Sequence, residues 1–137
     1  MSYCVELTIM GRKIKELGRL PDDLWVTFGR GPWCDFLAPG RYRDISRVHC
    51  GLRLSGSALL VHDLSTYGVY LLDRFGREVV EVWSGDAVHA VRARRLPEVA
   101  AVPLDEPILV GKRGLDLRLR SPLCRLDTQP LPPEEAA

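Results

Sequence analysis

Apolar and polar residues alternate with a period of two along most of the chain. Near the beginning, Val5, Leu7 and Ile9 share one side of an expected strand, and Glu6 and Thr8 share the other. Further strands are expected over Ile14–Leu17, Leu24–Phe28, Cys50–Leu54, Ala58–Asp63, Val69–Leu72, Val79–Val82, Ala87–Val91, Ile108–Val110 and Leu115–Leu119. Turns rich in Gly, Ser and Asp separate these short segments. The pattern predicts an all-β fold, a sandwich of two antiparallel sheets of short strands.

Two segments carry weaker signals. Ile14–Leu17 is charged, and Lys13 and Lys15 would discourage pairing with a second molecule, so we expect an edge strand there. The stretch from Arg92 to Ala101 shows a weak helical period and is followed by two prolines. It is too short and too weak for an independent helix, so it is predicted to be a long loop between the last strands.

The length of 137 residues suits one domain with a substantial core. We assign residues 1–123 to the β-sandwich. Residues 124–137 are rich in Pro and Glu and are expected to form a flexible tail. Within this tail Thr128 is a candidate phosphorylation site, through which the chain could bind itself in cis or in trans.

The formal net charge of +1 provides no overall field for nucleic acid or an anionic membrane. The densest basic stretch contains Arg92, Arg94 and Arg95, but no aromatic residues interleave with it for base stacking. No apolar run approaches the length of a transmembrane helix, and the N-terminus lacks the blocks of a signal peptide. We therefore expect a cytoplasmic protein that binds neither nucleic acid nor membrane.

The polar composition is biased. Of the 19 basic residues 16 are Arg, while the chain has no Asn and a single Gln. Scarcity of the amides that deamidate favours a thermophilic source, although the excess of Arg is also typical of a GC-rich genome.

The four cysteines have no Cys-x-x-Cys spacing and the three histidines are scattered, so neither a zinc site nor another cofactor is expected. Buried free thiols are the expected state in a cytosolic protein. In a hyperthermophile a Cys4–Cys124 disulfide would be the favoured pair, because the first and last strands of a sandwich often meet.

Three polar clusters lie at the ends of expected strands, at Gly29–Arg30, Ser46–His49 and Asp63–Gly68. The guanidinium of Arg30 offers a planar set of donors that matches phosphate oxygens, and the hydroxyls of Ser46 and Thr66 can donate to the same group. If the loops converge at one end of the sandwich, they form a receptor for a doubly charged oxyanion.

Neighbouring residues have supporting roles in this interpretation. Asp63 is expected to hold the N–H groups of a turn, Gly68 to supply a positive φ, and His49 to pin its loop by hydrogen bonds. No nucleophile and base are paired in the sequence. The chain is therefore predicted not to be an enzyme.

The order of these clusters resembles the forkhead-associated (FHA) domain family. The resemblance extends to Cys34–Asp35 and to Cys50, and it covers about Val5–Leu119. It implies a β-sandwich whose loops at one end bind an extended phosphothreonine peptide. The partner would then be a phosphothreonine-containing protein, either a Ser/Thr kinase or a kinase substrate.

The resemblance also implies a role for individual residues. Arg30, Ser46 and Thr66 would contact the phosphate, and Arg47 would lie beside them. Gly29, His49 and Gly68 would shape the loops. Arg43 and Asp44 stand where family members tune the residue accepted three places after the phosphothreonine, and Asp44 would disfavour an acidic residue there.

One position departs from the family pattern, which has Asn where this chain has Tyr67. That Asn bonds the peptide backbone, and losing one or two such bonds would cost roughly 0.5–3 kcal/mol of binding free energy. Two hypotheses follow. Either phosphate recognition persists and Tyr67 holds the peptide differently, or the site has become a phosphate-independent protein–protein scaffold.

Overall fold

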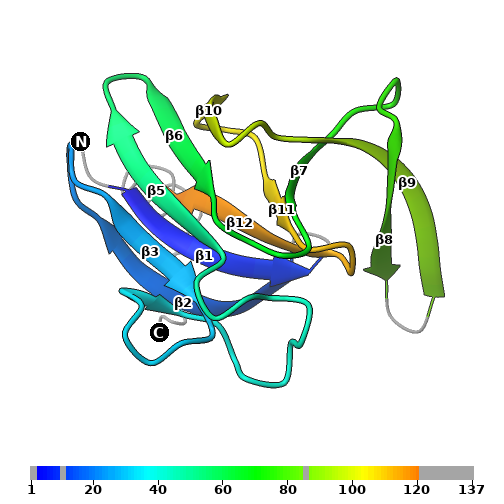
Figure 1. The fold of residues 1–137 in the computed structure, drawn as a ribbon, viewed down its shortest axis with the longest axis horizontal. Coiled ribbons are helices and arrows are strands. Elements are labelled where there is room, and N and C mark those ends of the chain that lie inside the picture. The colour runs from blue at the N-terminus through cyan, green and yellow to red at the C-terminus, as the bar shows by residue number, and fades with distance from the viewer. Residues whose placement is uncertain (1–2, 10–11, 85–86, 121–137) are drawn as a thin grey trace, which may run out of the picture.

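The computed structural model describes residues 3–9, 12–84 and 87–120, with the backbone alone for 82–84. These residues form two packed β-sheets (Figure 1). The seven-stranded sheet has the order β2 (Arg12–Leu20), β1 (Tyr3–Ile9), β12 (Leu115–Arg120), β11 (Ile108–Val110), β7 (Val69–Leu72), β9 (Ala87–Arg95) and β8 (Glu78–Ser84). The five-stranded sheet has the order β10 (Val99–Pro103), β6 (Ala58–Asp63), β5 (Cys50–Ser55), β3 (Val26–Gly29) and β4 (Phe36–Leu37). The predicted sandwich is confirmed.

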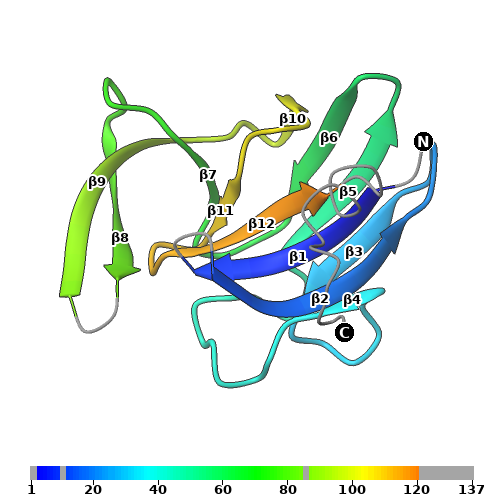
Figure 2. The ribbon, with the colours of Figure 1, turned by 180° about the vertical axis from the view of Figure 1, so that it is seen from behind.

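The first and last described strands pair with each other in the larger sheet, next to its edge strand β2. β1 and β12 run antiparallel in a register that extends from Cys4 opposite Arg120 to Ile9 opposite Leu115. Figure 1 shows this pair crossing behind β5 of the smaller sheet, and Figure 2, seen from the other side, shows it in front. One pairing is parallel: Phe28 of β3 lies opposite Phe36 of β4. The smaller sheet is therefore mixed.

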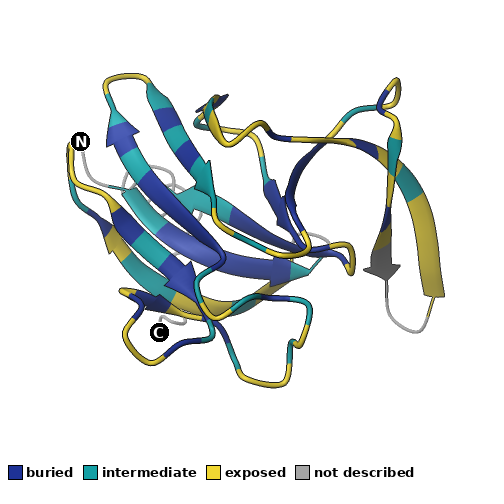
Figure 3. Ribbon diagram, viewed as in Figure 1, coloured by how far each residue is buried: buried dark blue, intermediate teal, exposed yellow. Residues whose placement is uncertain are grey.

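The hydrophobic core lies between the two sheets. Val5 and Leu7 of β1 contribute from the larger sheet, and Phe28, Leu52 and Val61 contribute from the smaller one. Figure 3 shows the buried residues concentrated on these facing strands, while most of β9 is exposed. This core fixes the strand ends from which the three polar clusters emerge.

β2 forms one edge of the larger sheet, as the charged segment Ile14–Leu17 predicts. The prediction of a long loop over Arg92–Ala101 is wrong. β9 continues to Arg95, which pairs with Tyr70 of β7, and Val99–Pro103 forms β10 at the edge of the smaller sheet. Arginines project from both faces of β9 into solvent, so the segment lacks the alternation that marks a half-buried strand.

Polar groups are also buried between β1 and β12. Thr8 Oγ1 donates a hydrogen bond to Asp116 Oδ1, and Arg118 Nε donates to the same oxygen over 3.1 Å. Burial raises the pKa of the Asp116 carboxyl, and both donors oppose that rise. The bonds compensate the carboxylate for lost hydration.

Some predictions concern residues that the structure does not describe. Cys124, Thr128 and the proposed tail 124–137 lie outside the described residues. Within the described ranges, no three His, Cys, Asp or Glu residues gather as a metal site. In those same ranges no helix is long and apolar enough to cross a membrane.

We expect Leu7→Ala to lower the free energy of unfolding by about 3 kcal/mol, because it deletes a side chain buried between the sheets. Leu72→Ala is the control, since Leu72 is half exposed on β7, and we expect a change of about 0.5 kcal/mol or less. Urea denaturation measures both. Equal losses in the two variants would contradict this assignment of the core.

Candidate functional site

Hydrogen bonds join three loops at one end of the sandwich. The first loop follows β3 (residues 30–35), the second lies between β4 and β5 (38–49), and the third between β6 and β7 (64–68). Arg30 N donates to Ser46 O over 3.1 Å, and Gly31 N donates to Arg47 O over 2.8 Å. Thr66 N donates to Ser46 Oγ over 3.0 Å. The structure thus brings Arg30, Ser46 and Thr66 together, although 36 positions separate the first from the last.

Arg30 is half-buried and oriented by the second loop. Its Nε donates to the carbonyl oxygen of Ile45, a residue that is completely buried. Within the described part of the chain, its two Nη atoms have no hydrogen-bond partner. One edge of the guanidinium therefore anchors the side chain, and the terminal nitrogens remain for a ligand with paired oxygens.

Ser46 makes three contacts that hold the loops together. Its carbonyl accepts from Arg30 N, its N–H donates to His49 Nδ1 over 2.9 Å, and its Oγ accepts from Thr66 N. Because the Oγ lone pair is used internally, the hydroxyl hydrogen is available to an outside acceptor. The exposed Thr66 lies next to it, and the hydroxyl of Thr66 bonds to no described residue. Both hydroxyls suit contact with an oxyanion.

His49 is completely buried and neutral. Its Nδ1 accepts from Ser46 N, so the ring proton lies on Nε2, which donates to Gly68 O over 3.0 Å. Burial lowers the pKa of His49 to about 4, although the bond to Gly68 opposes the shift. The imidazole links the second loop to the third, in agreement with the prediction that it pins its loop.

The third loop is shaped by short-range bonds around Ser65. Asp63 Oδ1 accepts from Ser65 N over 2.9 Å and from Ser65 Oγ over 2.5 Å. Ser65 Oγ in turn accepts from Gly68 N over 2.7 Å. Gly68 has a φ of +102°, so the predicted turn-building role of Asp63 and the predicted positive φ are both confirmed. The Ser65 hydroxyl faces inward, and Thr66 is left as the outward one.

The backbones of the first and second loops approach closely at Gly29. A Cβ on Gly29 would overlap the carbonyl oxygen of Arg47 and would lie 2.9 Å from that of Ser46. Gly29 therefore permits the contact that positions Arg30, an architectural role consistent with the prediction. Arg47 serves the same contact through its carbonyl, while its side chain is exposed beside the site.

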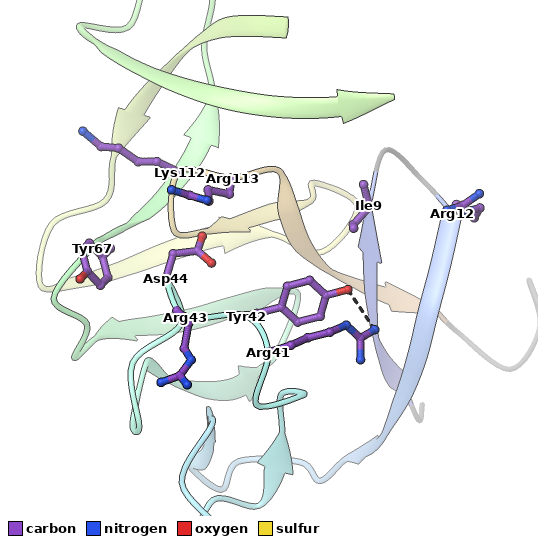
Figure 4. A pocket seen from close by; sticks show the side chains of 9 residues that line it. All are labelled: Ile9, Arg12, Arg41, Tyr42, Arg43, Asp44, Tyr67, Lys112 and Arg113. Atoms are coloured by element: carbon purple, nitrogen blue, oxygen red, sulfur yellow. Dashed lines mark hydrogen bonds between the residues drawn. The ribbon is translucent and has the colours of Figure 1, made fainter. Parts of the chain in front are cut away.

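Tyr67 faces away from the internal bonds of the third loop. Its carbonyl accepts from Tyr70 Oη over 2.8 Å, and its ring is 51% exposed. The ring lines a pocket that also includes Arg43 and Asp44, the two specificity candidates (Figure 4). The structure thus places these three residues beside, rather than within, the group formed by Arg30, Ser46 and Thr66.

Sequence reasoning missed two features. Arg95 forms an ion pair with Asp63 Oδ2 over 3.3 Å, which joins β9 to the end of β6, where the third loop begins. Lys112 and Arg113, on the turn between β11 and β12, line the pocket opposite the second loop. No local pattern marks either feature, because both depend on strands that are distant in sequence.

We expect Gly29→Ala to lower the free energy of unfolding by about 2 kcal/mol or more, since the added methyl group forces two backbones apart. Gly40→Ala is the matched control in the second loop, because a Cβ there meets nothing within 4 Å. Thermal and urea denaturation compare the variants. If Gly40→Ala is as destabilising as Gly29→Ala, the close approach is not the cause.

The neutral His49 makes folding sensitive to acid. Its pKa is about 4 in the folded protein and about 6.5 in the unfolded chain, so the folded state binds fewer protons between these values. The stability that depends on a neutral His49 is fully present above the pKa of His49 in the unfolded chain. It is lost as the pH falls through the pKa of His49 in the folded protein. We expect it to amount to about 3 kcal/mol.

Urea denaturation at a series of pH values should therefore show a steeper acid decline in the parent chain than in His49→Gln. An NMR titration of the His49 ring should find its midpoint near 4. A midpoint near the unperturbed value would exclude this account.

Comparison with known proteins agrees with the geometry. The FHA domain family model matches residues 26–90. Among solved structures, the FHA domain of the CT664 protein from Chlamydia trachomatis is 14% identical, with 88% of this chain and 98% of that chain covered and a TM-score of 0.61. An FHA domain solved in a study of phosphothreonine-dependent FHA domain interactions is 19% identical, with 88% and 99% covered and a TM-score of 0.53. Mycobacterium tuberculosis EmbR in complex with a low affinity phosphopeptide is 14% identical, with 85% and 24% covered and a TM-score of 0.52.

No curated protein sequence matches the chain. At these identities the solved structures establish the fold, while the family model recognises the segment that carries the three loops. The predicted resemblance is confirmed: residues 26–90 match the forkhead-associated (FHA) domain model, and the chain has the fold of solved FHA domains.

Proposed function

We propose that this protein is an interaction module that binds phosphothreonine-containing peptides in Ser/Thr kinase signalling. The observation that carries the proposal is the arrangement around Ser46. The anchored guanidinium of Arg30, the free hydroxyl hydrogen of Ser46 and the exposed Thr66 lie on loops bonded to one another. In this role all three contact the phosphate, and the exposed side chain of Arg47 adds charge at its edge.

The site suits a phosphate dianion better than a single carboxylate. The Nη atoms of Arg30 offer donors to paired oxygens, and the hydroxyls of Ser46 and Thr66 can donate to a further oxygen. The donors are held before the ligand arrives, so little side-chain freedom is lost on binding. Solved structures that this fold resembles include Mycobacterium tuberculosis EmbR in complex with a low affinity phosphopeptide, which supports the same ligand class here.

An interaction role also agrees with the state of His49. FHA domains are interaction modules. Both ring nitrogens of His49 are engaged in hydrogen bonds, and the residue is completely buried. The imidazole therefore has no free position from which to accept a proton from a substrate.

The second candidate function is a phosphate-independent protein–protein scaffold. It is favoured by Tyr67, which stands where the family pattern has Asn and presents a half-exposed ring instead of an amide. Under this alternative, apolar contact with Tyr67 carries the partner and Arg30 is dispensable. The two candidates therefore differ in what the loss of Arg30 does.

We expect Arg30→Ala to weaken phosphothreonine-peptide binding about a hundredfold, because two charge-assisted bonds to the phosphate are lost. Arg30→Lys keeps the charge but loses the planar donor set, so its affinity should lie between that of the parent chain and that of Arg30→Ala. Fluorescence anisotropy with a degenerate phosphothreonine peptide pool and its unphosphorylated counterpart measures the effect.

Arg74→Ala is the matched control. Arg74 is exposed between β7 and β8, where its guanidinium lies 4.9 Å from the ring of Phe75, and it should bind like the parent chain. Thermal denaturation checks that every variant is folded. Equal binding of the two pools, unaffected by Arg30→Ala, would refute phosphate recognition and favour the scaffold.

A further inference from the structure

A pocket of about 680 Å³ lies beside the three loops. Its size is in the range of pockets that take small ligands or ligand groups. Four parts of the chain form its walls: the adjoining ends of β1 and β2, the second loop, the third loop and the turn between β11 and β12. The lining residues are Ile9, Arg12, Arg41, Tyr42, Arg43, Asp44, Tyr67, Lys112 and Arg113. Figure 4 shows Tyr67 and Arg12 on opposite sides, with Asp44 and Tyr42 between them.

The pocket concentrates positive charge. Five of its nine lining residues are basic and one is acidic, whereas the whole chain has a net charge of only +1. A hollow lined by charges of one sign focuses their field and raises the local concentration of the opposite ion. The composition of the whole chain therefore does not account for the cluster of basic residues that lines the pocket.

Few of these cations are neutralised by neighbouring acids. Lys112 pairs with Glu78 over 3.4 Å, but both side chains are about half exposed, and ion pairs in contact with solvent are weak. Within the described ranges, no carboxylate forms an ion pair with Arg12, Arg41 or Arg43. The arginines therefore remain available to an anion from outside.

The one acidic lining residue is turned toward the protein backbone. A Cβ on Gly111 would overlap Asp44 Oδ2, and this oxygen is buried without a hydrogen-bond partner among the described residues. Burial raises the pKa of the Asp44 carboxyl, while hydrogen bonds from backbone N–H groups and the charge of Arg113 oppose the rise. Asp44 thus positions the turn that carries Lys112 and Arg113, and its charge is directed at that turn.

One arginine is held ready for a ligand. The guanidinium of Arg41 lies 4.7 Å from the ring centre of Tyr42, and its Nη2 donates to Tyr42 Oη over 3.2 Å. Figure 4 shows the two side chains lying side by side, with the hydrogen bond joining their polar ends. Holding a long side chain in place reduces the entropy lost when it binds an anion.

The pocket is continuous with the loops proposed to bind phosphate. Tyr67 directly follows Thr66, and Arg43 precedes Ser46 by three positions in the same loop. An extended peptide whose phosphothreonine contacts Arg30 and Ser46 would therefore pass its neighbouring residues across Tyr67 into the pocket. A single peptide can occupy both places.

We propose that this pocket is a second oxyanion site, which binds a further acidic group on the same phosphothreonine peptide. The group is a second phosphorylated residue or a cluster of carboxylates, and the inference rests on the proposed phosphothreonine binding. Asp44 taken alone would disfavour an acidic neighbour. The five surrounding cations reverse that preference, because the Asp44 charge is directed at the turn.

The test uses pairs of labelled phosphothreonine peptides and the full chain. The two peptides of a pair differ at one position only, where one carries phosphoserine and the other Ser, or one carries Glu and the other Gln. The varied position is moved in turn along both sides of the phosphothreonine. Fluorescence anisotropy gives the affinity ratio within each pair. We expect the more acidic peptide to bind about tenfold more tightly at one position or at adjacent positions, and the advantage to shrink as salt is raised.

Variants locate the source of this ratio. The double variant Arg41→Gln, Arg43→Gln should bring it close to one, whereas Arg74→Gln, which removes an exposed charge outside the pocket, should leave it unchanged. Asp44→Asn should enlarge it, since the pocket loses its only carboxylate. Comparing the phosphoserine and Glu pairs shows which acidic group is preferred.

The outcomes separate this inference from the proposed function. Ratios near one at every position, with binding still dependent on Arg30, overturn the second oxyanion site and leave phosphothreonine recognition standing. A ratio that survives the double variant also overturns it, because the charge then acts elsewhere. Binding that is indifferent to Arg30→Ala overturns the proposed function itself, whatever the ratio is.

Discussion

The position of the binding loops depends on one buried, neutral imidazole. His49 accepts a hydrogen bond from the backbone of Ser46 and donates one to the carbonyl of Gly68, so it spans the second and third loops. Its proton must lie on Nε2 for both bonds to exist. Burial, which lowers the pKa of the ring, therefore also keeps the loops in register. A charged imidazole would have two donors and would lose the bond from Ser46.

Fixing Ser46 fixes the other groups of the site. The Ser46 carbonyl receives the backbone of Arg30, and its hydroxyl oxygen receives the backbone of Thr66. Gly29 makes the first of these contacts possible, because any side chain there would push the loops apart. The donors proposed for phosphate are thus positioned by hydrogen bonds between the main chains and side chains of the loops themselves.

The two sides of the site differ in how firmly they are defined. On the phosphate side, main-chain contacts hold Arg30, Ser46 and Thr66. On the peptide side, Tyr67 presents a half-exposed ring to a pocket dominated by arginine and lysine. A peptide held by charge in that pocket would need fewer bonds to its backbone. The replacement of the usual Asn by Tyr67 is then compatible with phosphopeptide binding.

The alternation of residues was sufficient to predict the sandwich, and the polar clusters between the expected strands indicated the chemistry of its loops. Strands such as Val5–Ile9 place their apolar residues on one face, and Arg30, Ser46 and Thr66 lie in the polar segments between strands. The same reasoning failed for residues 92–101, because most residues of β9 are exposed and its pairing with β7 leaves no clear apolar alternation. Tertiary structure alone decided which hydroxyl faces outward, where Asp44 directs its charge, and that Arg12, Arg43 and Lys112 share one pocket. Those outcomes depend on contacts between segments far apart in the chain, and a local pattern carries no information about such contacts.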